Sequence, residues 1–363
     1  MVVWNSFRDR IPQAFYRLIG PVLLVILAAT GPGMVGTASA QEAVTSAVVL
    51  MYHRFGEDEY ASTSVTMEQF EAHVAELTSG KYTVMPLSRI VSALKAGTQL
   101  PERTVALTID DAYVSVYDRA WPILQRAEIP FTLFVATDPV DQGSSDFMTW
   151  DQILELKDSG LVEIGSQAVT HPHMPLKSDA RNREELTLSA NRLQEMTGIR
   201  PTLFAYPYGE ASRDIMTLTQ EQGYSAAFGQ HSGVTNSTSD MFYLPRFPIN
   251  VNYGGVERFT RLVNALPLPV SGLTPSNPTL PTEGSGNPPA FGFTVEGVSE
   301  NLTDLKCYHS DASQISDFQQ LGNRFEVRFD GAFAPGRTRI NCTMLGHSGR
   351  WRWFGMQYYV PPE

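Results

Sequence analysis

Seven short apolar segments, separated by stretches with helix-like patterns, constrain the fold of this chain more than any other feature. Their nearly continuous apolar character is typical of strands that are covered on both faces, as in parallel sheets. Alternation of such strands with helices is typical of a parallel α/β domain. The segments are residues 46–52, 104–109, 130–136, 162–166, 202–206, 224–229 and 243–249.

Helix start signals lie between these segments. Thr66 and Gln69 have the spacing of a capping box, and so do Thr149 and Gln152. In this motif the hydroxyl and the amide side chain satisfy backbone N–H groups at the start of a helix. We therefore expect helices to begin at both places.

Polar and ionisable residues stand at the ends of the apolar segments. In a β/α barrel the carboxyl ends of all strands open on one face, so these side chains would meet at one mouth. A doubly wound open sheet would scatter them along an edge. We therefore predict an incomplete (β/α) barrel of seven strands. The residues concerned are His53, Asp110, Asp111, Gln167, His171, His173, Tyr208, His231 and Arg246.

The rest of the chain divides into further parts. The first forty residues have the order of a secretory signal peptide, with arginines, a short apolar run and then Ala38-Ser39-Ala40. We predict cleavage after Ala40, export to the periplasm or the medium, and no stable membrane span afterwards. An uncleaved N-terminal membrane anchor is the alternative. The barrel then covers residues 41–266.

A proline-rich segment and a small domain follow the barrel. Residues 267–289 contain seven prolines and suit an extended linker. Residues 290–363 show short alternating segments that predict an all-β sandwich. Export would permit a disulfide between Cys307 and Cys342. Trp351, Trp353, Tyr358 and Tyr359 fit the core of the sandwich better than a sugar-stacking platform.

The charge balance excludes some functions. The chain has 27 Lys and Arg against 38 Asp and Glu, a formal net charge of −11. Contacts to phosphates need a basic face, so we expect no nucleic-acid partner. Two cysteines cannot form a zinc site of four thiolates.

The predicted mouth of the barrel has the residues of a metal-assisted hydrolase. Neighbouring side chains of an extended segment point in different directions, so one of Asp110 and Asp111 can bind a metal while the other stays free as a base. His171, in a loop after a strand, is a candidate ligand. His173 lies two residues further on and is a better candidate for a supporting position.

Three motifs make the chain similar to the polysaccharide deacetylases, the family with the homology domain of the nodulation chitooligosaccharide deacetylase (carbohydrate esterase family 4). TIDD at 108–111 resembles the family's T-F/I-D-D, QAVTH at 167–171 its H-S/T-x-x-H, and FAYPYG at 204–209 its R-x-P-Y-G or A-Y-P-Y-G. VLMYHRF at 49–55 also resembles the first strand of the branch that deacetylates exported biofilm-type glucosamine polymers.

The resemblance implies a role for each matching residue. Asp110 would be the general base, and Asp111 and His171 would bind a divalent metal, zinc or else cobalt or nickel. Pro207, Tyr208 and Gly209 would shape the acetyl pocket, with the backbone N–H of Tyr208 helping to hold the oxyanion.

Two further roles are inferred beside the motifs. Where the family often has an arginine that orients the base, this chain has Ala205, and Arg246 is the candidate replacement, with a structural ion pair as the alternative. His231 is preferred over His53 as the donor of a proton to the leaving amine. His53 would otherwise approach the metal, hold the base in place or contact the substrate.

Gln167 departs from the family pattern, because it occupies the position of the first metal-binding histidine. Gln167 could bind the metal weakly, His53 or His173 could supply the missing nitrogen, or the site could hold no metal. The resemblance implies an exported, metal-dependent enzyme that removes N-acetyl groups from a poly- or oligosaccharide of N-acetylglucosamine. The alternative is a catalytically degenerate protein that binds glycan or assists its export.

Overall fold

The computed structural model describes residues 45–310 and 315–362. The predicted signal peptide lies outside these ranges and stays a prediction. Among the described residues, no helix has the length and apolar character needed to cross a membrane.

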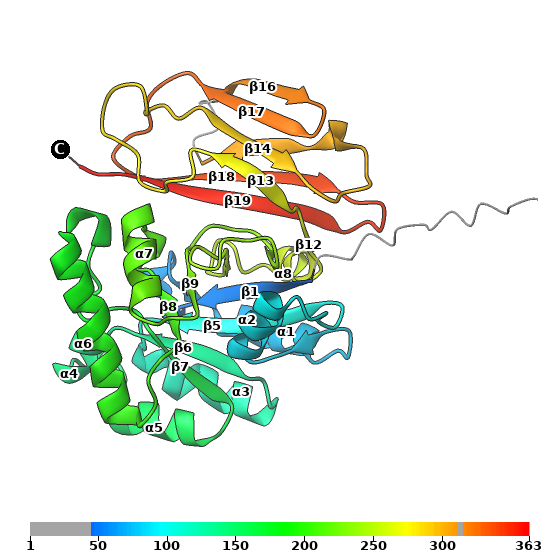
Figure 1. Cartoon of the computed structure of the whole chain (residues 1–363). Coiled ribbons are helices and arrows are strands. Elements are labelled where there is room, and N and C mark those ends of the chain that lie inside the picture. Colours follow the sequence, from blue (N-terminus) through cyan, green and yellow to red (C-terminus); the bar gives the residue numbers. More distant parts are fainter. Residues whose placement is uncertain (1–44, 311–314, 363) are drawn as a thin grey trace, which may run out of the picture. The chain divides into compact units, whose positions relative to one another are not determined.

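The first part of the described chain is a curled parallel sheet (Figure 1). Its order begins at β1 and continues through β5, β6, β7 and β8 to β9, with β11 paired to the other side of β1. Its strands are β1 (Ser46–Tyr52), β5 (Thr104–Asp110), β6 (Phe131–Val135), β7 (Val162–Ser166), β8 (Leu203–Ala205), β9 (Ala226–Phe228) and β11 (Phe247–Pro248).

The last predicted strand, 243–249, lies between the first and the sixth. Leu244 forms a parallel bridge with Phe228 of β9, and Phe247 is the register partner of Leu50 in β1. This confirms the predicted incomplete barrel of seven strands. Four more short strands occur in this part: β4 (Thr83–Val84) beside β5, β10 (Thr235–Asn236) beside β1, and β2 (Arg54–Phe55) with β3 (Ser64–Val65), which form a separate two-stranded sheet.

Helices alternate with these strands. Both predicted capping boxes are present, at Thr66 with Gln69 and at Thr149 with Gln152, and they start α1 and α5. The helices are α1 (Met67–Leu77), α2 (Leu87–Ala96), α3 (Trp121–Arg126), α4 (Thr137–Asp141), α5 (Trp150–Asp158), α6 (Asp179–Thr197), α7 (Arg213–Glu221) and α8 (Val256–Val263).

Two four-stranded sheets form the C-terminal part (Figure 1). One has the order β12 (Leu266–Pro267), β19 (Trp351–Val360), β18 (Gly336–Leu345), β15 (Lys306–His309). The other has the order β13 (Val270–Thr274), β14 (Phe291–Val295), β17 (Arg324–Phe329), β16 (Ile315–Leu321). The predicted β-sandwich is therefore present.

The predicted linker, 267–289, contains part of this sandwich. β13 lies wholly within that range and pairs with β14, and Thr279 forms a bridge with Tyr359. The prolines of this segment do not keep it apart from the sheets, because β13 contains none and Pro267 lies in β12, an edge strand, where a missing N–H is tolerated.

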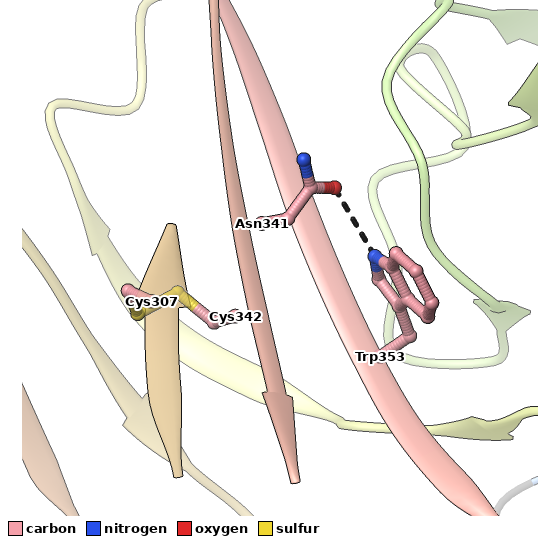
Figure 2. Close-up of a disulfide and its surroundings, with 4 residues drawn as sticks. All are labelled: Cys307, Asn341, Cys342 and Trp353. Carbon is pink, nitrogen blue, oxygen red and sulfur yellow. Dashed lines mark hydrogen bonds between the residues drawn. A yellow bond between two sulfur atoms is a disulfide. The ribbon is translucent and has the colours of Figure 1, made fainter. Parts of the chain in front are cut away.

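A disulfide joins β15 to β18, as predicted. Cys307 and Cys342 are directly opposite each other in the register, and their sulfurs are bonded (Figure 2). On the neighbouring strand pair, the indole N–H of Trp353 donates to Oδ1 of Asn341 at 3.1 Å (Figure 2). The Trp353 ring meets Phe247 edge-on, with 5.2 Å between centroids.

The barrel and the sandwich share a hydrophobic core. One cluster of buried side chains includes Phe204 and Tyr206 of the barrel and Phe291, Phe325 and Tyr358 of the sandwich. Side chains that interdigitate in this way hold the two parts together over their contact. The sandwich is therefore packed against the barrel through a common set of buried side chains.

Candidate active site

Asp110 ends β5 and is held by Arg246. Nη1 of Arg246 donates to Oδ1 of Asp110 at 2.7 Å, and Nη2 donates to Oδ2 at 2.9 Å. Neither side chain is exposed to solvent. Arg246 also donates to the carbonyl of Gly229 and to the hydroxyl of Thr108. The predicted bidentate contact is confirmed, and it fixes the orientation of the Asp110 carboxylate.

Asp111 directs a carboxylate oxygen toward His171. The distance from Oδ1 of Asp111 to Nε2 of His171 is 3.3 Å, and Oδ1 is buried without a hydrogen-bond donor. Burial lowers the pKa of His171, although the charges of Asp111 and Asp110 act in the opposite direction. His171 is therefore neutral at neutral pH and keeps a nitrogen lone pair. An unsatisfied carboxylate oxygen beside a neutral imidazole is a donor set that fits a divalent cation.

Gln167 takes part in the same cluster in a different way. Its Oε1 accepts the backbone N–H of Asp111 at 3.1 Å, and its Nε2 lies 3.3 Å from Nε2 of His171. The amide oxygen is thus already engaged by the backbone, which makes it a poorer ligand than the histidine of the family motif. Among the described residues, no group of three His, Cys, Asp or Glu side chains is arranged as a metal site.

Strained backbone is concentrated around these residues. Of the seven non-glycine residues with positive φ in the described chain, five belong to the strand ends and loops named above. Such conformations cost free energy and persist where the surrounding structure imposes them, which is common at functional sites. The five are Asp111, Ala112, Ala168, His171 and Tyr208.

A cavity of about 320 Å³ opens at this place. His53, Asp111, His171 and Tyr208 line it. Nε2 of His53 lies 3.9 Å from Oδ2 of Asp110, so His53 stands within reach of both the cavity and the base. Residues from several strand ends therefore converge on one mouth, as the barrel prediction required.

The segment Pro207–Gly209 forms a tight turn beside the cavity. Tyr208 has φ of 58°, and Gly209 has φ of 69°. A Cβ at Gly209 would come within 2.5 Å of the backbone nitrogen of Gln230, so only glycine fits there. The positive φ of Tyr208 and Gly209 and the close approach of Gln230 thus define a turn that requires glycine at position 209.

His173 supports this turn and does not line the cavity. Its Nδ1 lies 2.8 Å from Oε2 of Glu210, and its ring stacks on that of Tyr208 with 4.2 Å between centroids. This agrees with the preference for a supporting position over a metal ligand.

His231 does not line this cavity, although its carbonyl accepts the backbone N–H of Arg246 at 2.9 Å. It lines a different cavity, of about 200 Å³, and not the one that contains Asp111 and His171. Burial, with the charges of Arg339 and Arg246, lowers its pKa to about 3, so the ring is a neutral imidazole and not an acidic imidazolium at neutral pH. The preference for His231 over His53 as proton donor is therefore not supported by this structure.

Two residues of the sandwich reach the site without having been predicted. Arg337 of β18 lines the cavity, and Gln357 of β19 donates to the carbonyls of Tyr208 and Gly209 at 3.1 and 2.9 Å. Neither belongs to a motif, and no local signal in the sequence marks them. They lie far along the chain from the barrel strands, and tertiary packing alone brings them to the mouth.

Comparison with known proteins agrees with this architecture. Residues 97–227 match the family model described as polysaccharide deacetylase. A curated relative, the poly-beta-1,6-N-acetyl-D-glucosamine N-deacetylase of Escherichia coli K12, is 29% identical over 230 residues, which is 52% of this chain and 34% of that protein. The protein of the same name from Staphylococcus aureus MSSA476 is 25% identical, over 56% of this chain and 79% of that one. The chain thus spans only about a third of the length of the Escherichia coli relative.

Solved structures show the same fold. The Streptococcus pyogenes deacetylase PplD, in complex with acetate, superposes with a TM-score of 0.57 at 22% identity, over 61% of this chain and 99% of that one. IcaB from Ammonifex degensii gives a TM-score of 0.53 at 24% identity, over 61% of this chain and 99% of that one. The motifs, the curled sheet and the family match agree. Residues 97–227 of this chain therefore match the polysaccharide deacetylase family, and the sheet that contains them has the fold of these deacetylases.

Proposed function

We propose that this protein is an exported, metal-dependent hydrolase that removes N-acetyl groups from a poly- or oligosaccharide of N-acetylglucosamine. The observation that carries the proposal is the buried Asp110–Arg246 pair beside the unsatisfied carboxylate oxygen of Asp111 and the neutral His171. The relatives named for poly-beta-1,6-N-acetyl-D-glucosamine make that polymer the first substrate to test.

The proposed metal is held by Asp111 and His171. A divalent cation held there, zinc or else cobalt or nickel, would polarise the acetamide carbonyl and acidify a water molecule. Gln167 contributes at most a weak contact, since its oxygen already accepts from the backbone of Asp111.

The residues of the chain perform the remaining steps. Asp110, oriented by Arg246, takes the proton from the attacking water. The backbone N–H of Tyr208 donates to the oxygen that becomes negatively charged, while Pro207 and Gly209 shape the space for the acetyl group. His53, which lines the cavity, gives a proton to the departing amine.

Metal content and acetate release test the proposal together. The mature protein, loaded with zinc, cobalt or nickel, is expected to release acetate from acetylated β-1,6-linked glucosamine oligomers. Asp110→Asn should keep the metal and lose about 10²–10⁴-fold in rate, because the general base is gone. No metal uptake with any of the three ions, together with no acetate release, would refute the enzyme.

Gln167 favours one rival function, that of a catalytically degenerate protein that binds glycan or assists polysaccharide export. Gln167→His would restore the imidazole of the family motif. We expect the variant to bind zinc at least about tenfold more tightly and to release acetate faster. Gln194→His, at an exposed position of α6, is the matched control. An inactive wild type that becomes active only as Gln167→His would favour the rival.

A further inference from the structure

One wall of the cavity comes from the sandwich and not from the barrel. Arg337 lies on β18 and lines the cavity with Asp111, His171 and Tyr208. Its side chain is 38% exposed, so the guanidinium remains accessible to a molecule that enters. A cation therefore stands at the rim of a cavity whose lining also includes the carboxylate of Asp111.

Arg337 lies near the buried carboxylate of Glu210. Its Nε lies 3.8 Å from Oε1 of Glu210, and the side chain of Glu210 is 1% exposed. The other carboxylate oxygen of Glu210 is 2.8 Å from Nδ1 of His173. Burial raises the pKa of Glu210, while His173 and Arg337 lower it. The carboxylate of Glu210 therefore attracts Arg337 without forming a hydrogen bond to it, so the guanidinium keeps donors for an incoming molecule.

Aromatic rings continue from the cavity into the sandwich. The guanidinium carbon of Arg337 is 5.5 Å from the ring centroid of Tyr208. The Tyr208 ring stacks on His173, and His173 stacks on Tyr359 of β19 with 6.4 Å between centroids and an angle of 16°. Arg337 thus lies beside a continuous stack that crosses from one part of the protein to the other.

The sandwich also holds the turn that carries Tyr208. Besides the two hydrogen bonds from Gln357, the hydroxyl of Tyr243 donates to the carbonyl of Gly209 at 2.9 Å and to that of Gln357 at 3.3 Å. Several buried contacts therefore fix the turn relative to the sandwich strands. The position of Arg337 beside Tyr208 thus does not depend on a single exposed side chain.

We propose that Arg337 is a substrate-binding residue that determines specificity, and that the sandwich is thereby part of the glycan site. Its guanidinium donates hydrogen bonds to hydroxyl and amide oxygens of the acetylated chain at the rim of the cavity. The same positive charge repels the ammonium groups that deacetylation leaves on the product. Arg337 therefore favours acetylated over deacetylated chains. The substrate class rests on the proposed function.

Binding measurements test this inference without relying on catalysis. Calorimetric titrations compare fully acetylated with fully deacetylated β-1,6-linked glucosamine oligomers. Arg337→Ala is expected to bind the acetylated oligomer about tenfold more weakly than wild type and to show a smaller preference for it. Arg337→Lys should keep part of the preference, because it keeps the charge. Arg328→Ala, which removes an exposed arginine paired with Glu326 on the other sheet, is the control.

Kinetics separate this inference from the proposed function. In Arg337→Ala the KM for the oligomer should rise by a larger factor than kcat falls, because Arg337 binds the chain and takes no part in proton transfer. Wild type that binds the oligomer but releases no acetate refutes the proposed function and leaves Arg337 as a binding residue. Equal affinities of wild type and Arg337→Ala for both oligomers, or a wild type that binds neither, overturn the inference.

Discussion

Breaking the buried ion pair at the base of the site should be the most costly single change in the barrel. Arg246→Met removes two hydrogen bonds to Asp110, one to Gly229 and one to Thr108. Asp110 is then left with 0% exposure and without its cationic partner. Removal of one partner from a buried pair costs about 3–5 kcal/mol, because the remaining charge is neither solvated nor paired. We expect a loss of that size in the free energy of unfolding.

A double variant distinguishes this cause from simple loss of packing. Asp110→Leu combined with Arg246→Met replaces the pair by two apolar side chains. It should recover about 1–4 kcal/mol relative to Arg246→Met alone, since no charge stays buried. Arg213→Met, which breaks an exposed pair with Asp240 whose side chains are 46% and 42% exposed, should cost less than about 1 kcal/mol.

Chemical denaturation, followed by tryptophan fluorescence and far-UV circular dichroism, measures these differences. The comparison is valid where both signals change together and the denaturant slope is the same among variants. The reasoning is refuted if Arg246→Met costs less than about 1 kcal/mol, or if the double variant is no more stable than Arg246→Met.

Three further predictions follow from other contacts. Burial lowers the pKa of His73 from 6.5 to about 4, so the unfolded state binds more protons between these pH values and stability falls as the pH is lowered. Between pH 7 and pH 4.5, wild type should lose about 2–3 kcal/mol more of its free energy of unfolding than His73→Gln, as measured by denaturation, and equal losses would contradict this. Replacing both cysteines, Cys307→Ser with Cys342→Ser, opens a loop of sequence separation 35, so the free energy of unfolding should fall by about 3–4 kcal/mol. A change below about 1 kcal/mol would argue against a structural role of the disulfide. Gln357→Leu removes the side-chain donor to the Tyr208 turn, so the free energy of unfolding should fall by about 1–3 kcal/mol and kcat for deacetylation should fall more than KM rises. An unchanged kcat would show that the turn keeps its shape without this residue.

Local features of this protein could be predicted because they depend on neighbouring residues. The strand 46–52 and the capping box of Thr66 and Gln69 appear where the sequence indicates them. The strand 243–249 is realised only in part, as the two-residue β11 and a single bridge at Leu244. Its residues pair partly with β9 and partly with β1, between which the segment lies. The apolar pattern of the segment does not indicate that its pairing is divided in this way.

The candidate site also has one feature that could be predicted from the sequence and one that could not. The pairing of Arg246 with Asp110 could be inferred because a buried carboxylate at a strand end needs a partner and the usual arginine position is Ala205. The choice between His53 and His231 could not be made, since both follow apolar segments. Their difference lies in burial and in the cavity that each one lines.

The sequence alone was enough to identify the barrel, its motifs and the disulfide of this protein, because period, turn chemistry and strand-end residues are written in consecutive positions. Only the tertiary structure decided that β13 belongs to the sandwich and that Arg337 and Gln357 reach the mouth of the barrel. The contacts of Arg337 and Gln357 with Tyr208 join residues more than a hundred positions apart. They result from the packing of one hydrophobic core across both parts of the chain, and a non-local arrangement of this kind leaves no signal in any single segment.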